Sequence, residues 1–181
     1  MLTASNLFSF NEYSPKVNDS VFIAPTATLI GQVNISENSS VWFNTVLRGD
    51  EVSISVGANT NIQDGVVVHG NKGDNVEIGE NVTIGHRAII HGCHIKDGAL
   101  IGMGAIVLDG AVIGKGALIA AGAVVTAGKH VPAGELWAGC PAKSRGSVAG
   151  DVQSFMAANG QHYAKQASFY LNGSVKAVIK I

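Results

Sequence analysis

Three histidines in one stretch of the chain, His69, His86 and His91, are the residues best placed by type and spacing to do chemistry. Neutral imidazole is the commonest protein ligand of zinc and of several neighbouring metals. Residues 22 positions apart in this stretch match one another, Val68 with Ile90 and His69 with His91. The histidine therefore belongs to a repeat, and a repeated histidine suggests a metal site.

The repeat has a finer unit of six residues. Aliphatic residues recur at every sixth position from Ile95 to Val131, and alanines from Ala99 to Ala123 follow four places later. This pattern is typical of a parallel β-helix, in which each short strand points one aliphatic side chain inward and then turns at a small residue. Three such strands close a triangular coil of about 18 residues. We therefore expect an all-β fold, a β-helix over residues 21–143.

A coil of about 18 residues and an offset of 22 leave four residues over, which we assign to a polar loop at residues 70–75. His69 and His91 then occupy equivalent places in adjacent coils, whose strands are about 4.8 Å apart. That separation suits two imidazoles that bind one metal ion. His86 lies on the preceding side of the triangle, so its side chain should diverge from the pair. A three-histidine site would need His86 from a neighbouring subunit, which implies a homotrimer; the alternative is that His86 is an exposed turn residue.

Besides the extra loop, the hexads around the histidines have one irregularity. From Ile84 to Ile95 the chain takes 11 residues instead of 12, just where His86 and His91 lie, and such irregularities are often kept at functional sites. Cys93, in the same segment, is expected to point into the core as a small apolar residue.

Polar residues also interrupt the hexads within about one coil before His69. For Arg48, Asp50 and Asp64 we favour interface ion pairs that set the register of the trimer, with the positioning of a metal-bound water as the alternative. Gln63 is the better candidate for contact with water or an oxyanion, because an amide both accepts and donates hydrogen bonds. An amide on a solenoid face can also serve only as a rung of a hydrogen-bond ladder.

The two ends of the chain depart from the hexads. Residues 1–20 are expected to form an irregular lead-in that packs its aromatic residues over the open end of the β-helix. Those aromatic residues are Phe8, Phe10 and Tyr13. Apolar residues at helical spacing predict an α-helix across 147–171, in one or two pieces, packed along the prism. Residues 172–181 form a tail that could add a short strand.

Composition limits the class of protein. The 181 residues suit one domain, and with 14% charged residues and a net charge of −1 neither nucleic acid nor a membrane surface is expected as a partner. The sequence has no apolar run of membrane-spanning length and no signal-peptide pattern at its start, and its two cysteines are too few for a disulfide framework. We expect a cytoplasmic location by default.

An ordered set of motifs resembles the γ-class carbonic anhydrase family over nearly the whole chain. The motifs are Arg48-Gly49-Asp50, Asn61-Ile62-Gln63-Asp64, His69, Ile84-Gly85-His86, His91-Gly92-Cys93 and Leu100-Ile101-Gly102-Met103-Gly104-Ala105. The resemblance implies a left-handed β-helix and a homotrimer. It implies Zn²⁺, with Fe²⁺ or Co²⁺ as alternatives, bound by His69 and His91 of one subunit and His86 of the next.

The resemblance also implies an activity, the reversible hydration of CO₂ to bicarbonate, because the metal lowers the pKa of a coordinated water and the hydroxide attacks carbon. Gln63 would orient that water, Arg48 and Asp50 would pair across the interface with Asp64 nearby, and Glu51 would help to remove the proton. The loop between the first two histidines is short and has Asp74 as its only carboxylate, which argues against fast proton transfer. Tyr163 could reach the rim of the site, although packing is the simpler role for this side chain.

Two other functions compete with this one. A hexapeptide acyltransferase would share the repeat, but would need a catalytic base, and the suitable histidines are assigned to metal. A non-catalytic, metal-stabilised trimeric accessory protein is consistent with the short loop. The sequence does not identify the metal, the physiological substrate or the role of Cys140.

Overall fold

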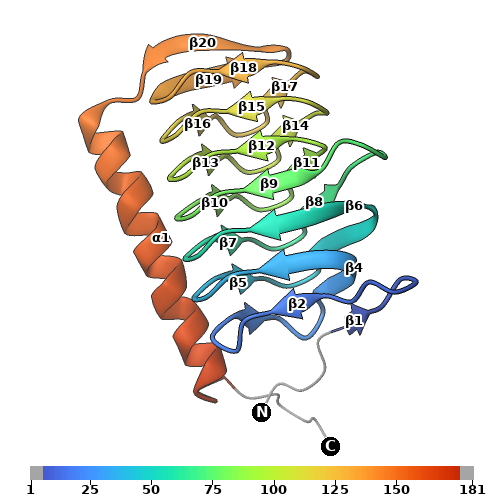
Figure 1. Ribbon diagram of the computed structural model, residues 1–181. Coiled ribbons are helices and arrows are strands. Elements are labelled where there is room, and N and C mark those ends of the chain that lie inside the picture. The colour runs from blue at the N-terminus through green and yellow to red at the C-terminus, as the bar shows by residue number, and fades with distance from the viewer. Residues whose placement is uncertain (1–5, 176–181) are drawn as a thin grey trace, which may run out of the picture.

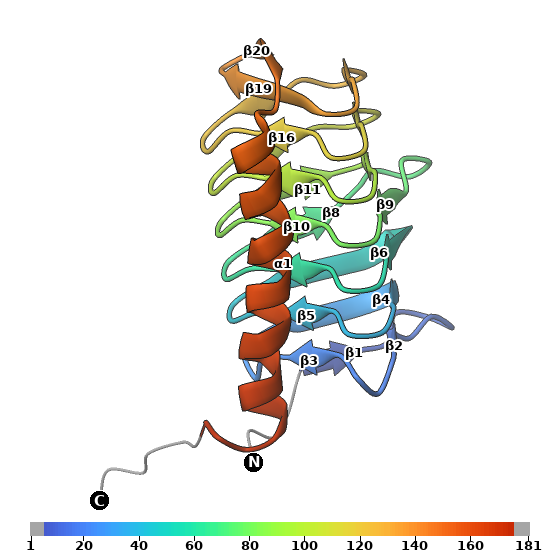
Figure 2. The same cartoon turned by 90° about the vertical axis from the view of Figure 1, so that its left-hand side faces the viewer.

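The computed structural model describes residues 6–175, which form a triangular prism of stacked coils with one long helix along it (Figures 1 and 2). The predicted parallel β-helix with a C-terminal helix is confirmed. The strands are β1 (Asn6–Phe8), β2 (Lys16–Val17), β3 (Phe22–Ile23), β4 (Thr28–Ile35), β5 (Ser40–Val41), β6 (Val46–Val56), β7 (Asn61–Ile62), β8 (Val67–His69), β9 (Val76–Ile78), β10 (Thr83–Ile84), β11 (Ile89–His91), β12 (His94–Ile95), β13 (Leu100–Ile101), β14 (Ile106–Val107), β15 (Val112–Ile113), β16 (Leu118–Ile119), β17 (Val124–Val125), β18 (His130–Val131), β19 (Glu135–Gly139) and β20 (Ala142–Ser147). The helix is α1 (Gly150–Leu171).

The prism has three faces, two of which belong to one sheet because β4 and β6 continue around a corner. The start of β6 pairs with β8 and its end pairs with β9. We call the side with β8, β11, β14 and β17 the histidine face, and the side with β9, β12, β15 and β18 the second face. The helix face is the remaining side, with β3, β5, β7, β10, β13, β16 and β19.

The core is a stack of inward-pointing aliphatic side chains. Ile84, Ile90 and Ile101 are completely buried, and burial of such a side chain stabilises the fold by about 1.5–3 kcal/mol relative to exposure. The predicted small residues turn the corners: Ala105 is completely buried, and Gly104 before it has a φ of 67°. That left-handed conformation favours glycine, because a Cβ atom would crowd the backbone.

The strand register gives the coil lengths around the histidines. β8 and β11 pair His69 with His91, as predicted, and the chain between β8 and β9 protrudes as a loop at residues 70–75 (Figure 1). The next coil is shorter, since β11 and β14 pair Ile90 with Val107, 17 positions later. Both predicted irregularities are therefore present beside the histidines.

The N-terminal segment differs from the prediction. β1 and β2 both pair in parallel with β4, so they already belong to the coils of the prism. Phe8, Phe10 and Tyr13 are 52%, 41% and 44% exposed, so they do not close the end of the core as expected. The positions of these aromatic residues in the sequence do not tell whether their side chains point toward the core or toward solvent, because successive side chains of a strand face opposite sides.

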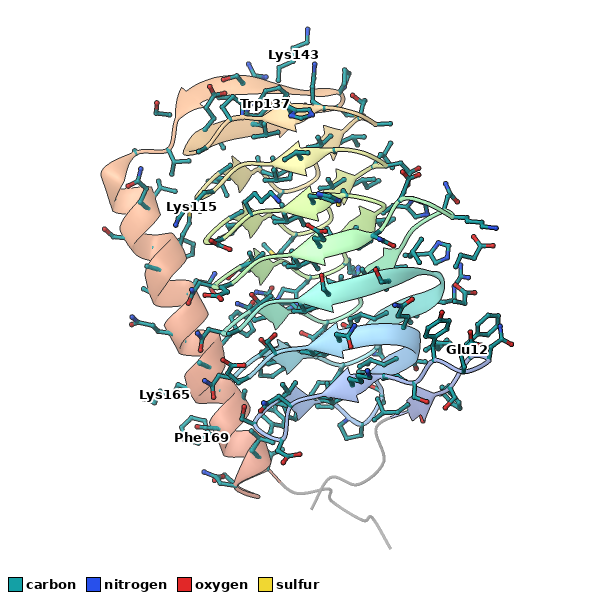
Figure 3. The ribbon with its side chains drawn as sticks, viewed as in Figure 1. Glu12, Lys115, Trp137, Lys143, Lys165 and Phe169 are labelled. Carbon is teal, nitrogen blue, oxygen red and sulfur yellow. The ribbon has the colours of Figure 1, made fainter. Side chains whose placement is uncertain are left out.

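The other end of the prism has a hairpin that the sequence did not predict. β20 runs antiparallel to β19 and ends the sheet of the helix face. Trp137 and Lys143 lie at this end (Figure 3). The Trp137 Nε1–H donates to Glu135 Oε2 at 2.8 Å, which holds the strand end in place.

α1 is one continuous helix that runs back along the helix face toward β3 (Figure 2). Met156 and Ala167 are the buried residues of α1, and its Tyr163 and Tyr170 each pack edge-on against Trp42. Phe155 is one of the apolar residues at helical spacing that predict this helix, yet it is 61% exposed, because the N-terminal part of α1 borders a pocket instead of packing on the face.

The predicted extra strand falls mainly on residues 176–181, outside the described part of the chain. Among residues 6–175, no helix combines the length and the apolarity needed to cross a membrane.

Candidate metal centre

His69 and His91 lie side by side at the ends of β8 and β11, with ring centroids 5.2 Å apart. His69 Nδ1 faces His91 Nε2 at 3.2 Å. Two nitrogens that each lie about 2.0–2.1 Å from a tetrahedral zinc ion would be about 3.3 Å apart. The observed separation fits two ligands of one metal ion, and the donor atoms are those that zinc prefers.

The second ring nitrogen of each histidine meets a carboxylate. His91 Nδ1 lies 2.5 Å from Asp109 Oδ1, and His69 Nε2 lies 3.2 Å from Asp50 Oδ1. Metal-bound histidines usually donate this second N–H to a carboxylate or carbonyl, which orients the ring. Each ring therefore has one nitrogen engaged by a carboxylate and one directed at the other histidine.

Asp109 is a site residue that the sequence analysis missed. It lies in the turn after β14, 18 residues beyond His91. Because 18 residues make one regular coil, a search for polar residues one coil away from each histidine would have found it. The run Leu108-Asp109-Gly110 also fits an ordinary turn, so the sequence does not mark Asp109 as a site residue.

Arg48 and Asp50 form an ion pair within the chain, with Nη1 2.5 Å from Oδ2. Both residues lie on β6 two positions apart, so their side chains leave the same side of the strand. Their predicted pairing across a subunit interface stays a prediction. Burial alone would raise the pKa of Asp50, but the hydrogen bond and charge of Arg48, with the contact to His69, lower it below its ordinary value. Asp50 is thus an anion suited to accept an N–H. Glu51 follows on β6 and is exposed.

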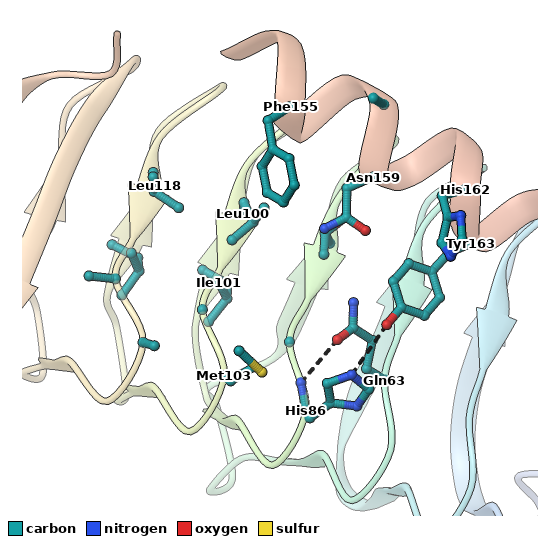
Figure 4. A pocket seen from close by; sticks show the side chains of 17 residues that line it. Gln63, His86, Leu100, Ile101, Met103, Leu118, Phe155, Asn159, His162 and Tyr163 are labelled. Carbon is teal, nitrogen blue, oxygen red and sulfur yellow. Dashed lines mark hydrogen bonds between the residues drawn. The ribbon is translucent and has the colours of Figure 1, made fainter. Parts of the chain in front are cut away.

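His86 lies in the turn after β10, away from the other two histidines. Its Nδ1 is 2.9 Å from Asp64 Oδ2, and its Nε2 is 3.2 Å from the Tyr163 hydroxyl (Figure 4). Within residues 6–175 of one chain, no three His, Cys, Asp or Glu side chains are grouped so as to hold a metal ion. His86 therefore diverges from the His69–His91 pair in the way the β-helix geometry predicts.

Gln63 and Tyr163 both hold His86. Gln63 is only 4% exposed; its Oε1 accepts the His86 backbone N–H at 3.1 Å and its Nε2 donates to Asn61 Oδ1 at 3.0 Å. This leaves one amide N–H of Gln63 for another acceptor. Burial, and then the charge of Asp64, raise the pKa of Tyr163, so its hydroxyl stays protonated and can donate to His86 Nε2.

A pocket of about 670 Å³ lies beside His86, between α1 and the helix face (Figure 4). Its walls are mainly apolar, formed by Leu100, Leu118, Met103 and Phe155. Polar groups gather toward one end: Gln63, His86, Asn159, His162 and Tyr163. The pocket is far larger than a CO₂ molecule, so it has room for a larger ligand or for side chains of a second copy.

Cys93 lies two residues after His91 but does not add a ligand. It is buried in the core, as predicted, and burial raises its pKa to about 12. Since metals bind the thiolate form, the protonated Cys93 does not compete with the histidines.

Comparison with known proteins gives partial sequence matches to carbonic anhydrases. Residues 92–127 match the family described as bacterial transferase hexapeptide (six repeats). The chain is 45% identical, over 42% of its length, to γ carbonic anhydrase 2, mitochondrial, of Arabidopsis thaliana, and 40% identical, over 35% of its length, to a carbonic anhydrase of Geobacillus kaustophilus. The matches span only about a third of these two relatives, 31% and 35% of their lengths.

Two solved structures match almost from end to end. One is a Bacillus cereus protein whose name assigns it provisionally to the acetyltransferases, with 39% identity and a TM-score of 0.92 over 93% of this chain and 98% of that one. The other is a hexapeptide transferase family protein of Anaplasma phagocytophilum, with 42% identity and a TM-score of 0.88 over 91% and 98%. The likeness thus covers both the prism and the helix.

Proposed function

Since the chain belongs to the hexapeptide-repeat family, in which the γ-class carbonic anhydrases are found, we propose that it is a metal-dependent carbonic anhydrase that interconverts CO₂ with bicarbonate and a proton. The observation that carries this proposal is the facing of His69 Nδ1 and His91 Nε2 at 3.2 Å, with each ring anchored by a carboxylate. Two histidines fixed in this way suit metal binding, whereas acyl transfer needs a single base.

Zinc is the proposed metal, with iron(II) or cobalt(II) as alternatives, because three histidines suit all of them. When bound, the metal would supply Lewis acidity that lowers the pKa of water toward neutrality. His69 and His91 would hold it with their facing nitrogens, and Asp50 and Asp109 would keep the two rings in place.

The remaining predicted residues would act around this centre. The free amide N–H of Gln63 would orient the reacting water or the developing oxyanion. Asp64 would hold the ring of His86 through Nδ1, which leaves Nε2 for the metal once the Tyr163 hydroxyl turns away from it. The carboxylate of Glu51 is exposed, so it would accept the released proton and pass it to solvent.

We assign the third ligand, His86, to a second copy of the chain in a homotrimer. The histidine face supports this, because it carries an outward apolar stripe beside the two histidines. The stripe consists of Val46, Val67, Ile89, Ile106 and Val124. Val67 and Ile89 at its centre are 41% and 39% exposed in the single chain, and a contiguous apolar stripe on the outside of a domain is typical of an interaction surface.

Replacing Ile89 by glutamate should therefore break the trimer. A carboxylate buried in an apolar interface carries a large desolvation penalty, so the expected result is a shift from three copies to one in light scattering, with loss of bound metal. Lys115→Glu is the matched control, because Lys115 is strongly exposed at a corner of the prism and should tolerate a charge change. An I89E protein that remains trimeric would show that this stripe is not the interface.

A second candidate function is acyl transfer. His86 is oriented by Asp64 and borders a pocket of about 670 Å³, which is how a general base would be presented to a bulky acyl donor. In that case His86 would take the proton of the acceptor, and the metal ion held by His69 and His91 would have a structural role. Release of coenzyme A from acetyl-CoA in the presence of amine or alcohol acceptors would identify this activity.

Stopped-flow CO₂ hydration is the test of the proposed function. The protein should be reconstituted anaerobically with Zn(II) or Fe(II), with metal per subunit counted on the same samples. Hydration that rises in proportion to metal occupancy is the expected result. Full occupancy with no hydration above background would argue against the enzyme and favour the acyltransferase or a metal-stabilised accessory protein.

A further inference from the structure

The two facing histidines use different ring nitrogens toward each other. His91 presents Nε2 and turns Nδ1 to Asp109, whereas His69 presents Nδ1 and turns Nε2 to Asp50. A neutral imidazole carries its proton on only one nitrogen, and the hydrogen bond made by that nitrogen decides which one it is. A carboxylate can only accept, so the proton of each ring belongs on the nitrogen that faces the carboxylate.

The surroundings of Asp109 are shaped to bring its carboxylate to His91. Gly92 has a φ of 51°, and a Cβ added there would collide with Asp109 Oδ1 and come within 2.9 Å of Asp74 Cβ. Only glycine leaves this approach open. Asn71, in the loop at 70–75, extends its Nδ2 to 3.4 Å from Asp109 Oδ2. The short coil and the protruding loop thus both place groups around this one carboxylate.

Asp50 and Asp109 differ in what else they bind. Asp50 uses its second oxygen for Arg48, which neutralises much of its charge. Asp109 has the neutral Asn71 amide on its second oxygen and lies closer to its histidine, 2.5 Å against 3.2 Å. The Asp109–His91 hydrogen bond should therefore be the stronger of the two.

We propose that Asp50 and Asp109 hold His69 and His91 in opposite neutral tautomers, Nε2–H in His69 and Nδ1–H in His91, so that both rings direct a lone pair at one shared point. Asp109 is the principal positioning residue. Its effect on metal affinity rests on the proposed function, whereas the tautomers belong to the protein without metal.

The tautomers are tested first, on metal-free protein with ¹⁵N-labelled histidine at about pH 8.5, where histidine is ordinarily neutral. Long-range ¹H–¹⁵N spectra distinguish Nδ1–H from Nε2–H rings. The expected result is Nδ1–H for His91 and Nε2–H for His69. In Asp109→Ala the His91 ring should lose its preference for Nδ1–H, and in Asp109→Asn it should keep it, because the amide oxygen still accepts.

Metal affinity is the second readout, measured by competition for Zn(II) with a chromophoric chelator. Removing a carboxylate that orients a metal ligand typically weakens binding about 10–100-fold, which is the expectation for Asp109→Ala. Asp109→Asn should fall between the alanine variant and the wild type. Asp97→Ala is the matched control, because Asp97 accepts the Glu80 backbone N–H from a similar turn and has no histidine partner among residues 6–175. The zinc affinity of this variant should be unchanged.

The outcomes separate this inference from the proposed function. His91 in the Nε2–H form in the wild type, or zinc binding by Asp109→Ala as tight as that of the wild type, would overturn the inference. Opposite tautomers in a wild-type protein that binds none of Zn(II), Fe(II) and Co(II) would support the inference and overturn the proposed carbonic anhydrase.

Discussion

Replacing His91 by alanine is expected to abolish zinc binding and CO₂ hydration together while leaving the fold intact. His91 supplies one of the two facing nitrogens, and its side chain lies on the outside of β11, so no core packing is lost. The loss of affinity should exceed the roughly 100-fold upper limit for residues that only orient a ligand. Metal per subunit, the hydration rate and the mass of the assembly should be measured on the same samples.

His94→Ala is the control for this experiment. His94 is a second partly exposed histidine close by in the sequence, but it lies on the second face, where its Nδ1 is 3.6 Å from Glu77. Its replacement should leave zinc content and hydration unchanged. A His91→Ala protein that retains full metal content would remove the basis of the proposed centre, whatever its activity.

Replacing Ile113 by alanine is expected to lower the free energy of unfolding by about 2–5 kcal/mol. Ile113 is completely buried and is stacked between Ile95 and Val131 of the adjacent coils. The narrow prism cannot collapse around a lost side chain, because its backbone ladder keeps the coils at a set spacing. Urea unfolding at one fixed protein concentration is the measurement, since an oligomer's stability depends on concentration.

The control for Ile113→Ala is Lys115→Ala, two residues later and exposed. This change should alter the free energy of unfolding by no more than about 0.5 kcal/mol. Equal effects of the two variants would contradict a stability that depends on the stacked core.

The fold was predictable because every coil of a solenoid has the same packing requirements, so the same residue pattern recurs along the chain. Each coil must place an aliphatic residue inward and a small residue at the corner, so a pattern every six residues reports the core directly. The pairing of His69 with His91 followed from the same arithmetic, and the register confirms it. The loop at 70–75 was predictable because the offset of 22 residues between the two histidines exceeds one coil of about 18 residues by four.

What could not be predicted lies on the outside of the prism, where no repeat constrains the side chains. Asp109 lies 18 residues beyond His91, but the run Leu108-Asp109-Gly110 does not differ from an ordinary turn, and the space that Gly92 leaves for the carboxylate is not visible in the sequence. Phe155 is spaced along α1 like the buried residues, yet it borders the pocket. Spacing alone does not show along which part of its length a helix packs on the sheet.

The antiparallel hairpin of β19 and β20 has a consequence for assembly along the prism axis. A parallel coil always leaves backbone N–H and C=O groups free at its last turn, and another copy could add there without limit. On the helix face this growth point is occupied by β20, whose outward residues, including Lys143 and Arg145, are exposed and cationic. The chain thereby ends its own sheet on that side with an antiparallel strand, whose cationic side chains disfavour end-to-end growth of the sheet.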